Sequence, residues 1–182
     1  MTDVAAMEAA LLTWVRTATG WPEAQVVLAA EDGPRPPAPS ARVGIAGPTH
    51  VGGPDEARHS YDSGGAAGSE IVTAVCGQRE TAVTVEVITD AGAGASAARV
   101  IADQIATAAR LPTIAAGFRA ADCSLIEAGP VRAIPDVLKT GVHGRAVLEA
   151  RFYTTTEAEE RAGYIAAIEA TDTTHSRVVE VP

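Results

Sequence analysis

Aromatic residues, cysteines and basic residues are all scarce in this chain, and each scarcity excludes a class of protein. Aromatics make up 4% of the 182 residues, so the core must consist mainly of small aliphatic side chains, which bury less apolar area each. Cys76 and Cys123 are too few for a disulfide framework, and neither has a second Cys or a His at metal-ligand spacing. With 14 Lys and Arg against 23 Asp and Glu, the net charge of −9 argues against binding nucleic acid through its phosphates.

Long apolar runs are missing as well. No run approaches the roughly 20 residues of a membrane-spanning helix, and Met1-Thr2-Asp3-Val4 lacks the basic start of a signal peptide. We therefore expect a soluble protein that is made in the cytoplasm, is not exported by the general route and has no membrane partner. An acidic surface also repels DNA, which would let DNA pass without sticking.

Motifs for catalysis are also absent, and we expect no catalytic residue, no metal and no cofactor. Walker, G-x-S-x-G and H-E-x-x-H patterns do not occur. The acidic run Glu157, Glu159 and Glu160 is typical of a solvated turn after a strand. The histidines fall in separate predicted loops and show no metal-ligand spacing: His50, His59, His143 and His175.

One glycine-rich turn keeps an enzyme open as an alternative. Residues 92–97 (Gly-Ala-Gly-Ala-Ser-Ala) fit G-x-G-x-x-A at the mouth of a helix, where a nucleotide's pyrophosphate binds in dinucleotide-binding folds. However, the preceding strand carries Thr84 and Glu86, whereas a parallel strand covered on both faces is nearly all apolar. A small cytosolic nucleotide-binding enzyme is therefore the less favoured alternative.

Two stretches have the apolar periodicity of helices, residues 4–18 and 96–110. Thr2 or Asp3 can cap the start of the first, Gly20 is placed for a left-handed C-cap, and Pro22 prevents continuation. A short helical turn is expected over residues 112–120. The predicted buried stripes are Val4, Met7, Leu11, Trp14, Val15 and Ala18 in the first helix, and Ala97, Val100, Ile101, Ile105 and Ala108 in the second.

Alternating residues predict the strands of the sheet. Residues 81–89 place Val83, Val85 and Val87 on one face, and residues 145–153 place Ala146, Leu148, Ala150 and Phe152 on one face. Such half-apolar strands suit an antiparallel sheet covered on one side. We therefore predict an α+β fold, with two helices packed on one face of a mixed, mostly antiparallel sheet. Further strands are expected over residues 25–30, 42–46, 71–76, 123–127 and 164–168, with a connection over 130–139 that contains a helical turn at 136–138.

Residues 47–69 are rich in glycine and polar residues and predict an extended hairpin or loop arm. This segment has too few large apolar side chains to form its own core, so we expect it to contact a neighbouring protein. Tyr61, its one aromatic residue, is the expected anchor. The remaining interface candidates are His50, Arg58, His59, Glu86 and Arg151. We predict one domain over residues 1–170, including this arm, and a polar tail over 171–182.

An ordered set of short motifs resembles the phage tail (neck) terminator family. Each motif is weak alone, but together they span most of the chain. The departures are Ser40-Ala41, where an aromatic is expected, and the length of the 47–69 segment. The motifs are Trp14-Val15, Thr19-Gly20-Trp21-Pro22, the prolines of residues 34–39, Gly129-Pro130-Val131, Ile134-Pro135, Thr140-Gly141, Arg145-Ala146-Val147-Leu148, Arg151-Phe152, Gly163-Tyr164-Ile165 and Glu169.

This resemblance implies a structural protein of the virion tail or neck. It implies a homohexameric ring that sits on the last ring of the tail tube, stops its polymerisation and offers a docking surface to the head connector. The implied partners are therefore the chain itself, the tail tube protein and the connector or stopper protein, while genomic DNA passes through the bore unbound. Alternatives are another head–tail joining protein, such as a stopper or adaptor, or the tube cap of a contractile injection system.

Overall fold

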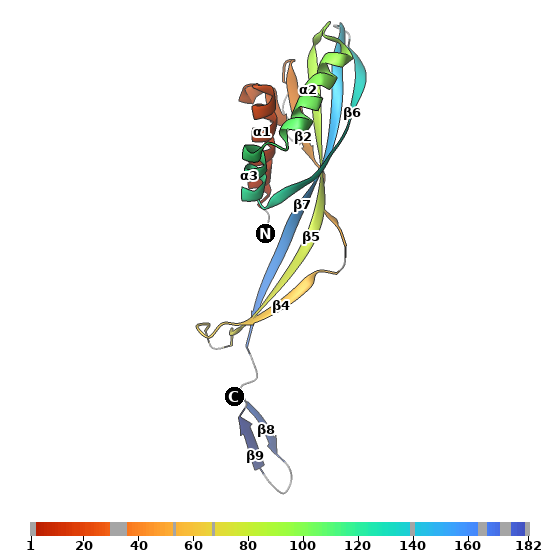
Figure 1. Cartoon of the computed structure of the whole chain (residues 1–182). Helices are drawn as coiled ribbons and strands as arrows, with labels where there is room; N and C mark the ends of the chain where they lie inside the picture. The colour runs from red at the N-terminus through yellow and green to blue at the C-terminus, as the bar shows by residue number, and fades with distance from the viewer. Residues whose placement is uncertain are drawn as a thin grey trace. The chain divides into compact units, whose positions relative to one another are not determined.

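The computed structural model describes residues 3–29, 36–52, 54–66, 68–138, 141–163, 167–171 and 176–180. The chain forms two compact units, Met1–Gly53 with Gln78–Thr156, and Pro54–Gly77 with Glu157–Pro182. The described elements are α1 (Val4–Thr19), a 3-10 turn η1 (Glu23–Gln25), β1 (Val26–Leu28), β2 (Ser40–Ile45), β3 (Thr49–His50), β4 (Glu56–Tyr61), β5 (Ile71–Ala91), α2 (Gly94–Ala108), α3 (Pro112–Ala120), β6 (Cys123–Leu138), β7 (Gly141–Ala162), β8 (Ala167–Thr171) and β9 (Ser176–Glu180) (Figure 1).

A mixed, mostly antiparallel sheet confirms the predicted α+β class. Its strand order is β1-β2-β5-β7-β6, and β3 and β4 pair with β5. β1 and β2 are parallel, whereas β2, β3 and β4 each run antiparallel to β5. β5 and β7 are long enough to contribute residues to both units.

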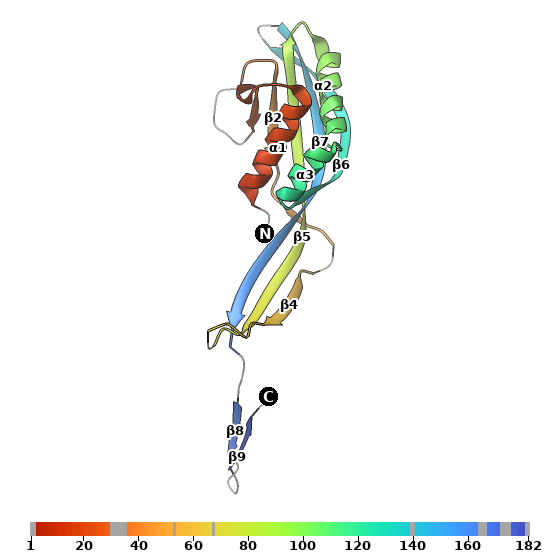
Figure 2. The same cartoon turned by 60° about the vertical axis from the view of Figure 1, so that its left-hand side comes forward.

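The first unit has its helices on one face of this sheet, as predicted (Figure 2). The Asp3 carboxylate accepts the Ala5 amide N–H at 3.0 Å and so caps α1. Gly20 ends α1 with φ 70°, a conformation that costs glycine little, and its N–H donates to the Arg16 carbonyl. The short turn predicted over residues 112–120 is the helix α3, which Pro112 begins.

The scarce aromatic residues are concentrated in the core of the first unit. Trp14 of α1, Phe118 of α3 and Phe152 of β7 meet edge to face, with ring centroids 5.0–6.2 Å apart. Such pairs contribute about 0.5–1.5 kcal/mol each beyond the area they bury. The Trp14 indole N–H also donates to the Ile105 carbonyl of α2 at 2.9 Å, so one side chain joins all three helices to the sheet.

The alternation of the central strands is confirmed by burial. Val83, Val85 and Val87 are fully buried under the helices. The even-numbered residues of β7 from Ala146 to Phe152 are buried as well. Thr84 on β5 and Glu149 on β7 are exposed, so these strands present a second, largely polar face, here called the open face.

The second unit is built differently, because no helix covers its sheet among the described residues. β4 forms an antiparallel hairpin with residues 71–76 of β5, in the register Glu56↔Cys76 to Tyr61↔Ile71. β5 lies beside β7 in both views (Figures 1 and 2). β8 and β9 make a separate two-stranded antiparallel sheet.

Several predicted elements are wrong in extent or type. Residues 136–138 continue β6 instead of forming a helical turn, and Glu157, Glu159 and Glu160 lie in β7 instead of a turn. Residues 47–69, predicted as an extended hairpin or loop arm, contain β3 and β4, and β4 pairs with β5 as a hairpin. Of the strand predicted over residues 164–168, residues 167 and 168 belong to β8, and residues 164–166 lie outside the described part of the chain. The domain boundaries at 170 and 171 stay a prediction.

Candidate functional site

The described surface offers places for protein contact more readily than a reaction centre. Within the described residues, no three or more His, Cys, Asp or Glu side chains are grouped so that they could hold a metal ion. In the same part of the chain, no helix is long and apolar enough to cross a bilayer. The candidate surfaces are the open face and a cavity, both in the first unit, and the β4–β5 hairpin of the second unit.

Ion pairs join the strands across the open face. Arg145 Nε of β7 lies 2.7 Å from Glu86 Oε1 of β5. Six residues farther along β7, Arg151 lies 2.6 Å from Glu127 of β6 and 3.2 Å from Glu80 of β5. Hydrogen bonds to Glu127 and then to Glu80 raise the pKa of Arg151 above its ordinary value, so Arg151 stays charged. The interface candidates Glu86 and Arg151 thus lie in ion pairs within the chain, on one face of the sheet.

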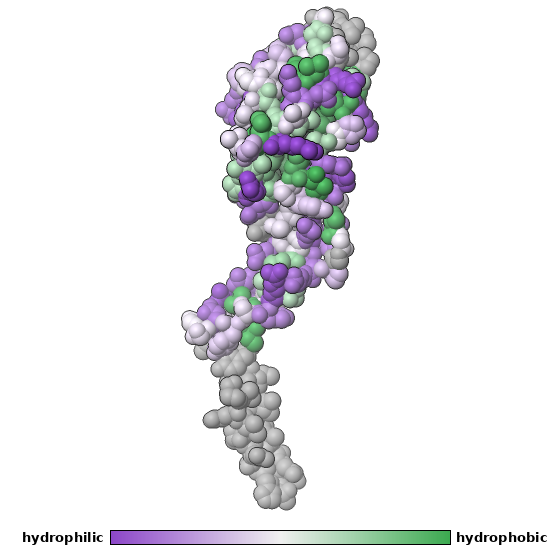
Figure 3. All heavy atoms as spheres, in the orientation of Figure 1, coloured by the Kyte–Doolittle hydropathy of each residue, from purple (hydrophilic) through white to green (hydrophobic). Residues whose placement is uncertain are grey.

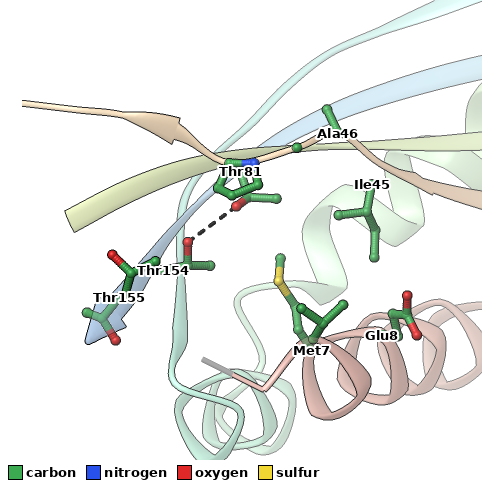
Figure 4. Close-up of a pocket in the computed structure, with 11 residues that line it drawn as sticks. Met7, Glu8, Ile45, Ala46, Thr81, Thr154 and Thr155 are labelled. Carbon is green, nitrogen blue, oxygen red and sulfur yellow. Dashed lines mark hydrogen bonds between the residues drawn. The ribbon is translucent and has the colours of Figure 1, made fainter. Parts of the chain in front are cut away.

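A cavity of about 320 Å³ lies where the start of α1 approaches the end of β2 and interior residues of β5 and β7 (Figure 4). Met7 and Ile45 give it apolar walls, and the Thr81 and Thr154 hydroxyls, 3.3 Å apart, meet between β5 and β7. Val4 also lines the cavity and is 66% exposed, so solvent reaches it. Its polar lining groups are the threonine hydroxyls and the Glu8 carboxylate, beside apolar side chains. Sequence reasoning missed this cavity, because a threonine run is ordinary in strands.

Three interface candidates lie together on β4, and a fourth lies on β3. All six residues of β4 are exposed, and Tyr61 is 63% exposed. His59 Nδ1 is 3.0 Å from the Thr73 hydroxyl of β5, while Arg58 pairs with Glu56 at 3.1 Å. The hydrogen bond to Glu56 raises the pKa of Arg58, with a smaller contribution from Glu157 of β7. His50 is exposed and pairs in register with Arg79 of β5, in the first unit.

The end of β7 is tied to the turn after β4. Arg161 Nη1 donates to Asp62 Oδ2 at 3.0 Å, and the Gly64 N–H donates to Asp62 Oδ1 at 3.1 Å. These bonds hold the pKa of Asp62 below its ordinary value of 3.8, and the bond from Arg161 has the larger effect. A Cβ on Gly163 would lie 2.9 Å from the Gly68 Cα, so this approach requires glycine.

The exposed apolar side chains do not form one large patch in the view of Figure 3, where green and purple atoms alternate over the first unit. Val100 and Leu111 are 55% and 47% exposed and border a shallow groove along α2. Exposed apolar side chains that are dispersed in this way do not single out a ligand site. They are consistent with a protein that contacts its partners through several surfaces.

The nucleotide-site alternative has little support in the structure. The helix after the glycine-rich turn follows β5, whose paired neighbours β2, β3 and β4 all run antiparallel to it. A dinucleotide-binding turn instead belongs to a parallel strand–helix–strand unit.

Comparison with known families gives one match that covers nearly the whole chain. The model of the family described as "Phage neck terminator protein" matches residues 5–178. That range includes every described helix and strand except the first residue of α1 and the last two residues of β9. The sequence matches no curated protein.

Proposed function

Because the chain belongs to the phage neck terminator protein family, a family of virion structural proteins, we propose that it is the protein that ends the tail tube. Six copies form a closed ring on the last ring of the tube, stop further polymerisation and present a docking surface to the head connector. The observation that carries this proposal is the family match over nearly the whole chain.

The second unit supports assembly with other proteins. A two- or three-stranded sheet needs a packed apolar face to be stable, and here Tyr61 and Val75 are 63% and 37% exposed. Contact with a neighbouring protein would bury them. We propose that Tyr61 anchors this contact, with Arg58 and His59 on the same strand contributing polar contacts. In the first unit, we propose that His50, Glu86 and Arg151 make polar contacts of their own.

A ring also explains how growth can stop. A head-to-tail interface that closes by rotation gives a ring, whereas one that does not close gives a filament. A terminator must therefore bind the tube end on one side and offer a different surface on the other.

Charge is consistent with a conduit for DNA. Six copies at −9 each carry 6 × (−9) = −54. An acidic bore would repel a polyanion and prevent the salt-dependent sticking that basic surfaces cause.

The test is a phage that lacks this gene. Its tails should be irregular in length or unable to join heads, and expression of the protein from a plasmid should restore both properties. Tails of normal length on filled heads would refute the proposal. Tails of normal length that stay unattached would instead identify another head–tail joining protein.

The anchoring role of Tyr61 has its own test. Tyr61→Ala should reduce the yield of infectious particles, whereas Tyr153→Ala, at an exposed tyrosine in the first unit, should leave it near the wild-type level. Normal assembly of Tyr61→Ala would exclude this residue as an anchor.

A further inference from the structure

The outer strands of the two units differ in the features that discourage pairing with another strand. In the first unit, β6 carries Pro130 and Pro135 and two shifts of register against β7, and β1 is three residues long. Proline lacks the N–H that a new strand would need, and bulges and short strands also discourage pairing. The outer strands of the first unit are therefore poor templates for another chain.

In the second unit, the outer strands lack these protections. β4 pairs with β5 on one side, and its other edge has no strand partner in the described part of the chain. β7 pairs with β6 as far as Thr154, so its residues 157–162 extend past that partner. Both six-residue stretches are exposed and contain no proline or glycine. Exposed edges of this length readily pair with another strand.

Charge favours pairing of unlike edges. Residues 157–162 of β7 hold three Glu and one Arg, a formal charge of −3 + 1 = −2. β4 holds one Glu and one Arg, a formal charge of −1 + 1 = 0, together with His59. Two β7 edges would repel each other, whereas Arg58 and His59 of β4 offer side chains that glutamates of β7 can pair with.

The strand directions determine how such a joint would be built. β4 is antiparallel to β5, and the pairs Glu80–Arg151 and Glu86–Arg145 show that β5 is antiparallel to β7. β4 and β7 therefore run the same way. Rotation about a ring axis leaves the direction of a strand along that axis unchanged, so β4 of the next copy would meet β7 in parallel.

We propose that the outer edge of β4 in one copy pairs, as a parallel strand, with residues 157–162 of β7 in the next copy. Each copy then adds three strands to a sheet that continues round the assembly. The joint uses different surfaces on the two partners, as a closed ring requires, whereas a β4–β4 joint would stop at a dimer. This inference rests on the proposed ring and specifies how its subunits are held together.

Cysteine cross-linking tests the joint in the full chain. In a Cys76→Ser background, which keeps the buried Cys123, one cysteine is placed on β4 (Ala57→Cys or Ser60→Cys) and one on β7 (Ala158→Cys or Ala162→Cys). At least one of these four combinations should give, on oxidation, a ladder up to the full ring on a denaturing gel. The matched pair Val100→Cys with Tyr153→Cys, exposed in the first unit, should give no ladder.

Charge reversal tests the pairing without cross-links. Arg58→Glu should lower the ring fraction seen by native mass spectrometry by about tenfold, because like charges would then face each other across the joint. Adding Glu159→Arg and Glu160→Arg should restore the ring. Arg99→Glu makes the same charge change at an exposed site on α2 and should assemble normally.

The outcomes separate the joint from the ring itself. Wild-type rings without a cross-linked ladder, with Arg58→Glu assembling normally, would overturn the joint and leave the proposed ring intact. Cross-linked dimers from a single cysteine on β4 would show a two-fold β4–β4 contact and also overturn it. Wild-type protein that stays monomeric, alone and with tube protein, would remove both the ring and the joint.

Discussion

Among single residues, Trp14 has a central place in the core of the first unit. It contacts Phe118 and Phe152 and donates its indole N–H to Ile105. Trp14→Ala should lower the free energy of unfolding by about 3–5 kcal/mol, as large-to-small changes in cores do. Trp14→Phe should cost less, since it keeps much of the apolar volume. Urea unfolding followed by circular dichroism measures both, and Val100→Ala, at an exposed site, should stay within about 0.5 kcal/mol of wild type. A Trp14→Ala protein as stable as the Val100→Ala control would contradict this ranking.

The buried thiol of Cys123 should be unreactive in the folded protein. Burial raises the pKa of its thiol to about 11, and its Sγ lies 3.3 Å from the Phe118 carbonyl oxygen. The thiolate is the reactive form, so a Cys76→Ser protein should not react with a thiol reagent at pH 8 until denaturant is added. Mass spectrometry after timed labelling measures this, with unfolded Cys76→Ser protein as the positive control. Rapid labelling of the folded variant would show that Cys123 is reachable.

Burial of individual residues was only partly predictable from the sequence. The stripe of α1 from Met7 to Val15 is buried as predicted, but Val4 is exposed, because the periodicity does not show where the covering sheet ends. Among the described side chains of α2, Ala98, Ala102 and Ile105 are buried, as is Ala109 at the C-cap, while Val100 faces solvent. The helix is alanine-rich, so apolar residues occur on several sides and the pattern does not indicate one face.

At the scale of elements, the sequence predicts the helices and central strands well and the long outer strands poorly. Gly20, Pro22 and Pro112 mark helix ends through backbone chemistry, which is local. The extension of β6 through Pro130 and Pro135 was missed, because proline normally argues against a strand and is tolerated here on an edge. The acidic end of β7 was missed for a similar reason. Its glutamates lack apolar alternation, and pairing with a neighbouring strand is not visible in a local pattern.

The bond between Asp62 and Arg161, which joins the turn after β4 to the end of β7, should depend on pH. In the folded protein the pKa of Asp62 is held below 3.8, so the ionised carboxylate stabilises the turn. This stabilisation is complete above the pKa of the unfolded chain and is lost as the pH falls through the pKa of the folded protein. Arg161→Ala removes the first cause and should move the Asp62 pKa up toward 3.8. An NMR titration of the side-chain carboxyl measures the change, and Arg99→Ala should leave the titration unaltered. An unchanged Asp62 titration in Arg161→Ala would show that the bond does not form in solution.

At the scale of the whole molecule, the two units should differ in stability. The first has a continuous core under its helices, whereas all six residues of β4 in the second are exposed. In dissociated protein, amides of residues 56–61 should exchange with solvent at least about tenfold faster than those of residues 146–152. Hydrogen exchange with mass spectrometry measures this, and assembly should protect residues 56–61. Equal exchange rates in both segments before assembly would contradict a second unit that needs its neighbours.

The pairing of β5 with β7 has a consequence for synthesis. Glu80 and Arg151 are 71 residues apart in the chain, so a ribosome adding about 5–20 residues per second needs about 4–14 s between them. During that interval β2 and β4 can already pair with one edge of β5, while its other edge waits for a strand not yet made. The nascent chain thus has a central strand with one unpaired edge until late in translation. Hence we expect chaperone access during this period, and the speed of translation through residues 81–151, to influence the yield of assembly-competent protein.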